Sequence, residues 1–179
     1  MLQLFSGLAR WQRRRLSRLC VVVITGSAGK TTAKDLLHSI LRTRMKGRAN
    51  RLSYNRPHRI VRQLLTMTKR DEFLVQEVSV EQPGGMDEPL RMLQPRIGLV
   101  TCIGFDHYSA FRGPENAALE KGKLVRSLSA DGWAILNADA PLVMAMREGT
   151  AAQVLTYGHA ANADLRASRG LARPADNLG

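Results

Sequence analysis

Residues 26–32, with the sequence GSAGKTT, have the side chains and spacing needed to bind a phosphate group. In a glycine loop at a helix start, backbone N–H groups point toward an anion. A lysine there reaches the outer phosphates of a nucleotide, and the hydroxyl that follows it coordinates Mg²⁺. The segment therefore predicts a site for ATP and Mg²⁺, and the alternative is a chance glycine turn with a surface lysine. The expected nucleotide-binding residues are Gly26, Ser27, Ala28, Gly29, Lys30, Thr31 and Thr32.

The elements on either side of this loop are of the kind that such a site requires. Residues 20–25, CVVVIT, are apolar and rich in β-branched side chains, which predicts a buried strand. Residues 31–44 have helical apolar spacing, carried by Leu36, Leu37, Ile40 and Leu41. The first glycine stands three residues before Gly29, so the loop is shorter than the general GxxxxGK(S/T) pattern. Strand, glycine loop and helix are expected to follow one another directly.

The rest of the chain alternates between strand-like and helix-like segments. Further strands are expected at 73–79, 97–103, 133–137 and 153–158. Helices are expected at 114–128 and 141–148, and another is expected to begin at Pro57, with an apolar stripe of Ile60, Val61, Leu64 and Leu65. Residues 45–56, 81–89 and 104–114 are expected to be loops, and 160–179 a frayed tail. This alternation predicts an α/β domain, with a mostly parallel sheet flanked by helices. We expect a basic amphipathic segment at 1–18, the nucleotide-binding domain, apparently incomplete, at 19–165, and a tail at 166–179.

Positive charge is concentrated in the first part of the chain. The net charge is +12, yet residues 1–70 hold 17 Lys and Arg and one acidic residue, Asp35. Such a surface favours an anionic partner, namely a nucleotide, nucleic acid or a membrane surface. Residues 42–70 could bind an acidic substrate or nucleic acid, or could be a solvated face. Their lone aromatic residue, Tyr54, argues against binding of single-stranded nucleic acid.

The N-terminal segment has its own alternatives. Residues 1–19 predict a helix, with Leu4, Leu8, Trp11 and Leu19 near one face and arginines around the others. A helix of this kind could lie on a membrane, or could be a solvated helix docked on the domain. No apolar run is long enough for a membrane span. Cys20 and Cys102 lie in strand-like runs and are expected to be buried thiols in a reducing, cytoplasmic setting.

Several stretches resemble the Mur ligases, the ATP-dependent amide-bond ligases of peptidoglycan (cell-wall) precursor synthesis. TGSAGKTTAKDLL resembles the family's nucleotide-binding loop, and VQEVSVEQPGGM its metal-binding glutamate and Pro-Gly turn. PRIGLVTCIGFDHYSAFRG, NAALEKGKL and WAILNADAP resemble three later family segments, in the same order along the chain. The loop and its Thr-Thr-x-Lys-Asp continuation are most similar to the branch that adds a D-alanyl-D-alanine dipeptide.

This resemblance implies an activity and a set of site residues. The family phosphorylates a carboxylate with ATP, and an amine then attacks the acyl phosphate. Its implied substrates are a UDP-linked muramoyl peptide and an amino acid or dipeptide. The implied catalytic residues are Lys30, His107 and Lys121, the last as a carbamate. The implied Mg²⁺ ligands are Thr31, Glu77, His107 and Lys121, and the implied residues near the adenine are Asn137 and Asp139.

Some positions depart from the family pattern. The family often has Asn where Cys102 stands and Glu where Lys123 stands, and Asn55 is the remnant of a paired-asparagine signature. Each site residue also has a plainer interpretation. Glu77 could be a solvated acid in an edge strand, His107 a loop histidine, and Lys121 part of an exposed salt-bridged helix face. Asn137 could cap a turn.

The resemblance covers only part of a family member, which has three domains. We therefore expect that this chain alone binds nucleotide weakly and does not ligate, and that a complementing chain could supply the missing parts. Two other classes stay open: a non-ligase nucleotide-binding module and a basic protein that binds nucleic acid or membrane. A third alternative is another amino-acid-adding relative, such as a polyglutamate-type ligase.

Overall fold

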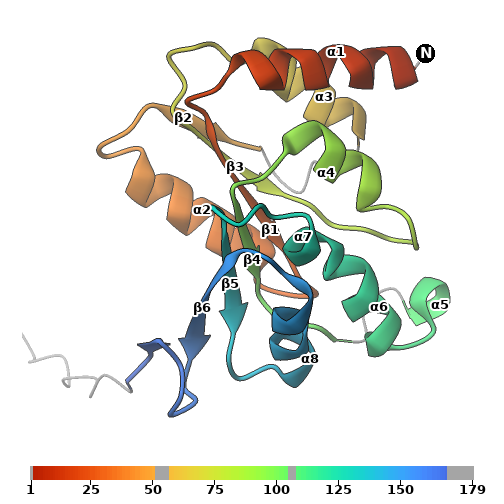
Figure 1. Cartoon of the computed structure of the whole chain (residues 1–179), viewed down its shortest axis with the longest axis vertical. Coiled ribbons are helices and arrows are strands. Elements are labelled where there is room, and N and C mark those ends of the chain that lie inside the picture. Colours follow the sequence, from red (N-terminus) through yellow and green to blue (C-terminus); the bar gives the residue numbers. More distant parts are fainter. Residues whose placement is uncertain (1, 51–56, 105–107, 169–179) are drawn as a thin grey trace, which may run out of the picture.

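The computed structural model describes residues 2–50, 57–104 and 108–168, and these form a parallel sheet with helices on both faces (Figure 1). The sheet order is β2-β3-β1-β4-β5-β6-β7, and all six pairs of neighbouring strands are parallel. The expected α/β fold with a parallel sheet is confirmed. The strands are β1 Cys20–Thr25, β2 Gly47–Ala49, β3 Phe73–Glu77, β4 Ile97–Val100, β5 Trp133–Asn137, β6 Gln153–Gly158 and β7 Leu165–Arg166.

Helices follow most of the strands, as crossover connections between parallel strands require. They are α1 Leu2–Arg15, α2 Lys30–Leu41, α3 Pro57–Thr66, α4 Asp87–Leu93, α5 Tyr108–Phe111, α6 Pro114–Lys121, α7 Lys123–Arg126, α8 Pro141–Met144 and the 3₁₀ helix Ala145–Gly149. Within residues 2–50, 57–104 and 108–168, no helix is long and apolar enough to cross a membrane.

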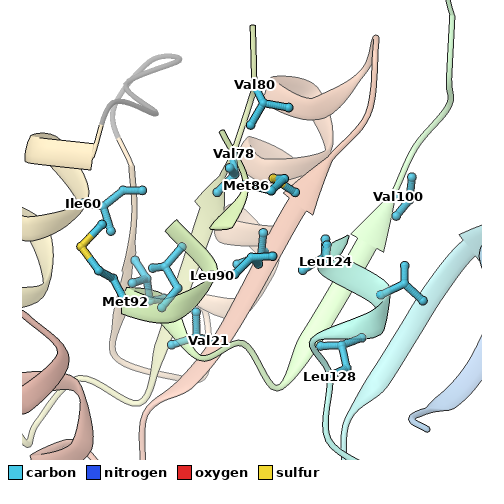
Figure 2. Close-up of a cluster of buried hydrophobic side chains, with 14 of the residues drawn as sticks. Val21, Ile60, Val78, Val80, Met86, Leu90, Met92, Val100, Leu124 and Leu128 are labelled. Carbon is cyan, nitrogen blue, oxygen red and sulfur yellow. The ribbon is translucent and has the colours of Figure 1, made fainter. Parts of the chain in front are cut away.

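The two faces of the sheet are covered differently. On one face α1, α3, α4, α6, α7 and α8 pack over a large core, part of which Figure 2 shows. There Met92 of α4 lies toward Ile60 of α3, while Leu124 and Leu128 lie beside β4. On the other face α2 packs on β1 and β3. The glycine loop that begins α2 is thereby fixed to the centre of the sheet.

Two strands and the helices α5, α6 and α7 differ from the sequence-based expectation. Gly47–Ala49 was expected in a loop and forms β2, and Leu165–Arg166 was expected in a tail and forms β7. Both are edge strands of two or three residues, which is too short for an alternation of apolar and polar residues to indicate a strand. The short helix α5 lies in an expected loop, and the helix expected at 114–128 is divided into α6 and α7 at Gly122.

Helix α1 docks on the domain through a face that the sequence did not indicate. Ala9 of α1 is buried against the core, as are Leu16 and Leu19 just after the helix. Leu19 was expected on the apolar face, but Leu8 and Trp11, expected there too, are about half exposed. Arg13 fixes the helix, since its Nε donates to the Leu93 main-chain oxygen at 2.8 Å. The alternative of a helix docked on the domain therefore describes α1, and its outer surface keeps exposed apolar side chains.

One buried carboxylate predicts how the fold responds to acid. Asp71 accepts hydrogen bonds from the Thr68 amide (2.8 Å) and hydroxyl (3.1 Å), and it forms an ion pair with Arg48 (3.2 Å). Burial alone would raise the pKa of Asp71, but the bonds from Thr68 and Arg48 outweigh it, and the pKa lies below its ordinary value. The stabilisation is therefore present above the ordinary carboxyl range and is lost as the pH falls through the lowered pKa.

Asp71→Asn is expected to reduce the free energy of unfolding at pH 7 by about 1–3 kcal/mol, because it removes the charged partner of Arg48. Urea unfolding of both proteins at pH 7 and at acidic pH measures this. The difference between them should shrink in acid, where the wild-type carboxyl becomes protonated. A difference that does not change with pH would contradict this assignment.

Candidate nucleotide-binding site

The glycine loop lies where β1 ends and α2 begins, at the carboxyl edge of the sheet. Gly26 has a φ of 143°, and Gly29, the residue before α2, has a φ of 77°. Both values favour glycine. The Ser27 amide donates to the Cys102 main-chain oxygen at 2.8 Å, which ties the loop to the end of β4. Backbone amides at a helix start are thus presented toward the space above the sheet, as a phosphate site requires.

The two glycines are expected to respond differently to substitution. A Cβ at Gly26 would lie 2.0 Å from Thr101 Oγ1 and 3.0 Å from the Cys102 main-chain oxygen, whereas a Cβ at Gly29 meets nothing within 4 Å. Gly26→Ala combines backbone strain with a collision and should lower the free energy of unfolding by about 3 kcal/mol or more. Gly29→Ala has the strain alone and should cost about 1–2 kcal/mol. Thermal and urea unfolding compare them, and equal losses would contradict the geometry.

Lys30, Thr31 and Glu77 come together at this loop. Lys30 Nζ donates to the Ser27 main-chain oxygen at 3.1 Å, so its ammonium is folded back onto the loop. Thr31 Oγ1 donates to Glu77 Oε2 at 2.8 Å, which joins the first turn of α2 to the last residue of β3. A hydroxyl and a carboxylate side by side next to a phosphate loop are oxygen ligands that suit Mg²⁺.

Glu77 is not a solvated acid in an edge strand. It is 1% exposed, and β3 lies between β2 and β1. A buried carboxylate is costly unless it is hydrogen bonded or paired with a cation. The donor set therefore fits a divalent cation shared with nucleotide phosphates. Among the described residues no cluster of three or more His, Cys, Asp and Glu side chains could hold a metal.

Lys121 is buried and contacts the loop. It is the last residue of α6, its side chain is fully buried, and its Nζ donates to Ser27 Oγ at 3.1 Å. The same hydroxyl accepts from the Gly104 amide at 2.8 Å. The interpretation of Lys121 as part of an exposed salt-bridged face is wrong. That description fits Lys123, which pairs with Asp87 at 2.9 Å and Glu120 at 3.0 Å, and these carboxylates raise its pKa.

Asn137 and Asp139 hold loops together at the same edge of the sheet. Asn137 Nδ2 donates to the Thr101 main-chain oxygen at 2.8 Å, and its Oδ1 accepts from the Asp139 amide at 2.9 Å. The Asp139 carboxylate accepts from the amides of His159 and Ala160, both at 2.8 Å, and these bonds lower its pKa. The turn-capping alternative thus describes Asn137, and its expected place near the adenine stays a prediction.

Some expectations fall elsewhere. His107, an expected catalytic residue and metal ligand, and Asn55 lie outside the described residues. Cys20 and Cys102 are free thiols. Both are half-buried, whereas the sequence analysis expected them to be buried. Burial raises the pKa of Cys20. Thr32, also expected to bind nucleotide, lies in the first turn of α2.

Three residues near the site were missed by the sequence analysis. Thr101 Oγ1 donates to the Ala28 main-chain oxygen at 2.6 Å and so shapes the loop from the end of β4. Lys34 and Asn50 are buried beside Thr31 and Glu77. The spacing of Lys34, three residues after Thr31, was visible in the sequence, but lysine at such a position is ordinarily exposed.

An open cleft of about 890 Å³ adjoins this group. It is lined by residues of α2, which include Thr31 and His38, by the end of β2 and by α3. Arg59 and Arg62 are the lining residues of α3 that carry positive charge. The cleft thus carries positive charge next to the candidate metal ligands, which suits a ligand with anionic groups.

Comparisons with known proteins identify the family of this chain. The model of the Mur ligase middle domain matches residues 24–176. The UDP-N-acetylmuramoyl-tripeptide–D-alanyl-D-alanine ligase of Mycobacterium leprae is 33% identical over 146 residues, covering 79% of this chain and 28% of that protein. The ligase of the same name from Bacillus subtilis is 30% identical over 138 residues, covering 77% of this chain and 30% of that protein.

A solved structure has the same fold. A crystal structure of MurF from Acinetobacter baumannii superposes with a TM-score of 0.84 and 26% identity, over 88% of this chain and 35% of that one. The chain thus spans about a third or less of the length of these relatives. The matched family model covers most of the chain and includes the glycine loop, Glu77 and Lys121. The chain belongs to the Mur ligase family and corresponds to its middle domain.

Proposed function

We propose that this chain is the ATP-binding part of an amide-bond ligase of peptidoglycan precursor synthesis. The observation that carries the proposal is the contact between Thr31 and Glu77, 2.8 Å apart beside the glycine loop. A phosphate cradle with a hydroxyl–carboxylate pair at its edge is suited to a nucleotide with a divalent cation. The named relatives are ligases that join D-alanyl-D-alanine to a UDP-N-acetylmuramoyl-tripeptide.

Each residue has a role that follows from its position. The amides at the start of α2 would bind the phosphates, and Lys30 would leave the Ser27 carbonyl to reach the outer phosphate. Thr31 and Glu77 would hold Mg²⁺, which when bound neutralises phosphate charge during transfer to a carboxylate. Asn137 and Asp139 would adjoin the adenine.

Lys121 supports a ligase site over a simpler nucleotide-binding module. Its Nζ is fully buried and touches the loop through Ser27. As an ammonium it would repel a second cation, whereas as a carbamate it would offer anionic oxygen ligands. We propose that Lys121 is carbamylated in the active protein and acts with His107. A non-ligase module has no need of a lysine at this position.

The substrates are proposed to be a UDP-linked muramoyl peptide and an amino acid or dipeptide. The Arg59 and Arg62 side of the cleft offers positive charge for the acidic substrate. Because the named relatives are more than twice as long as this chain, we propose that ligation needs residues beyond these 179, supplied by a complementing chain or by further domains.

Calorimetric titration of the folded chain with Mg-ATP, followed by a phosphate-release assay with UDP-N-acetylmuramoyl-tripeptide and D-alanyl-D-alanine, tests this proposal. We expect binding without phosphate release. A folded chain that binds no nucleotide would overturn the nucleotide-binding role. Release that depends on both co-substrates would show that the chain suffices, and would overturn the need for further residues.

A further inference from the structure

Lys34 is a buried lysine one turn after Thr31 on α2. It is 1% exposed, its Nζ donates to the Asn50 main-chain oxygen at 3.0 Å, and it pairs with the exposed Asp35 at 3.2 Å. Withdrawing an ammonium from water is unfavourable unless its hydrogen bonds are satisfied. An apolar side chain could fill this place without the free-energy cost of burying a charge. The contact with Asn50 is therefore the feature that distinguishes lysine from an apolar residue here.

Asn50 fastens the end of β2 to the end of β3. Its amide donates to the Val75 main-chain oxygen at 3.2 Å, and its Oδ1 accepts from the Glu77 amide at 2.8 Å. The side chain thus replaces a ladder hydrogen bond at the point where β2 stops. The Asn50 side chain is also buried, so water does not compete freely for the hydrogen bond between its Oδ1 and the Glu77 amide. The backbone of Glu77 is therefore fixed by Asn50, and Asn50 by Lys34.

These contacts close a ring. Thr31 and Lys34 are three residues apart, which places them on one face of α2. From Lys34 the ring passes to Asn50, then to Glu77, and returns through the 2.8 Å bond between Glu77 and Thr31. Three separate elements, α2, β2 and β3, thereby hold the two oxygen ligands beside each other.

We propose that Lys34 and Asn50 are positioning residues that hold the Glu77 carboxylate beside Thr31 for the cation bound with the nucleotide. This inference rests on the proposed function. Ligands held in place before binding need no ordering when the cation arrives, which favours its binding. The two residues act on the cation-dependent part of nucleotide binding, and the phosphate contacts of the glycine loop do not depend on them.

Calorimetric titration of the full chain with ADP, once with Mg²⁺ and once with EDTA, separates the cation-dependent part of nucleotide binding from the part that the glycine loop provides. We expect Mg²⁺ to strengthen ADP binding by the wild-type chain about tenfold. In Lys34→Met and Asn50→Ala this ratio should fall to about twofold or less, while affinity in EDTA stays within about twofold of wild type. Asp35→Asn is the matched control, since it alters the exposed partner of Lys34 and should keep the wild-type ratio.

Circular dichroism establishes which variants are folded. If Lys34→Met does not fold, Asn50→Asp decides, because aspartate keeps the acceptor for the Glu77 amide and should restore much of the ratio that Asn50→Ala loses. Folded variants with the wild-type ratio, or equal ratios in Asn50→Ala and Asn50→Asp, would overturn this inference alone. A wild-type chain that binds no ADP in either condition would overturn the proposed function, and this inference with it.

Discussion

Lys30→Ala is expected to weaken Mg-ATP binding by about 30- to 100-fold, which corresponds to ~2–3 kcal/mol. The side chain carries an ammonium that is folded back onto the Ser27 main-chain oxygen of the loop. Its removal leaves the outer phosphates without a charge-assisted partner. The fold should survive, because Lys30 stands at the first position of α2 and is only partly buried. Calorimetry with the two folded proteins measures the change.

Lys46→Ala is the matched control for this prediction. Lys46 is exposed and lies after α2, so its replacement removes the same charge from the same basic surface. We expect its effect on Mg-ATP affinity to stay within about twofold. Equal losses in Lys30→Ala and Lys46→Ala would mean that general positive charge attracts the nucleotide, and that the glycine loop is not its site.

Glu77→Gln is expected to remove most of the benefit that Mg²⁺ gives to nucleotide binding. The amide keeps the size of the side chain and an acceptor for the Thr31 hydroxyl, so the contact between β3 and α2 persists. It loses the negative charge that a divalent cation requires of its protein ligand. Affinity for ADP in Mg²⁺ should fall about tenfold, and affinity in EDTA should stay the same or rise slightly.

Glu81→Gln is the control, because Glu81 is an exposed carboxylate a few residues after β3. It should leave both affinities near their wild-type values. A Glu77→Gln protein whose Mg²⁺ dependence equals that of wild type would remove Glu77 from the metal site. The buried carboxylate would then serve only to tie β3 to α2.

The centre of the fold could be predicted from the sequence because its signals are local. β1 is an apolar run rich in β-branched residues, which is typical of a buried strand. α2 directly follows a glycine loop, and its apolar residues have helical spacing. The same logic failed for β2, where the three residues Gly47–Ala49 gain strand geometry only by pairing with β3. It also failed for the outer face of α1, since the neighbouring helices decide which side of an amphipathic helix is buried.

The candidate site divides in the same way. The resemblance of VQEVSVEQPGGM to a family segment pointed to Glu77, and its position at the end of an apolar strand places it at the carboxyl edge of the parallel sheet. The burial of Lys121 and Lys34 could not be predicted, because lysine is almost always exposed and its burial depends on partners far away in the sequence. Ser27 is 94 residues from Lys121, and Asn50 reaches Glu77 across 27 residues. No local pattern encodes such contacts.

The most direct test of the account is to record the amide NMR spectrum of the folded chain while Mg-ATP is added. We predict that the largest shifts occur at the amides of residues 26–32, with smaller shifts at Glu77 and around Asn137. These are the groups that we propose to lie around a bound nucleotide, given their contacts at this edge of the sheet. Shifts confined to the arginine-rich helix α1, or a spectrum that saturating Mg-ATP leaves unchanged, would contradict the claim that this domain binds nucleotide at its glycine loop.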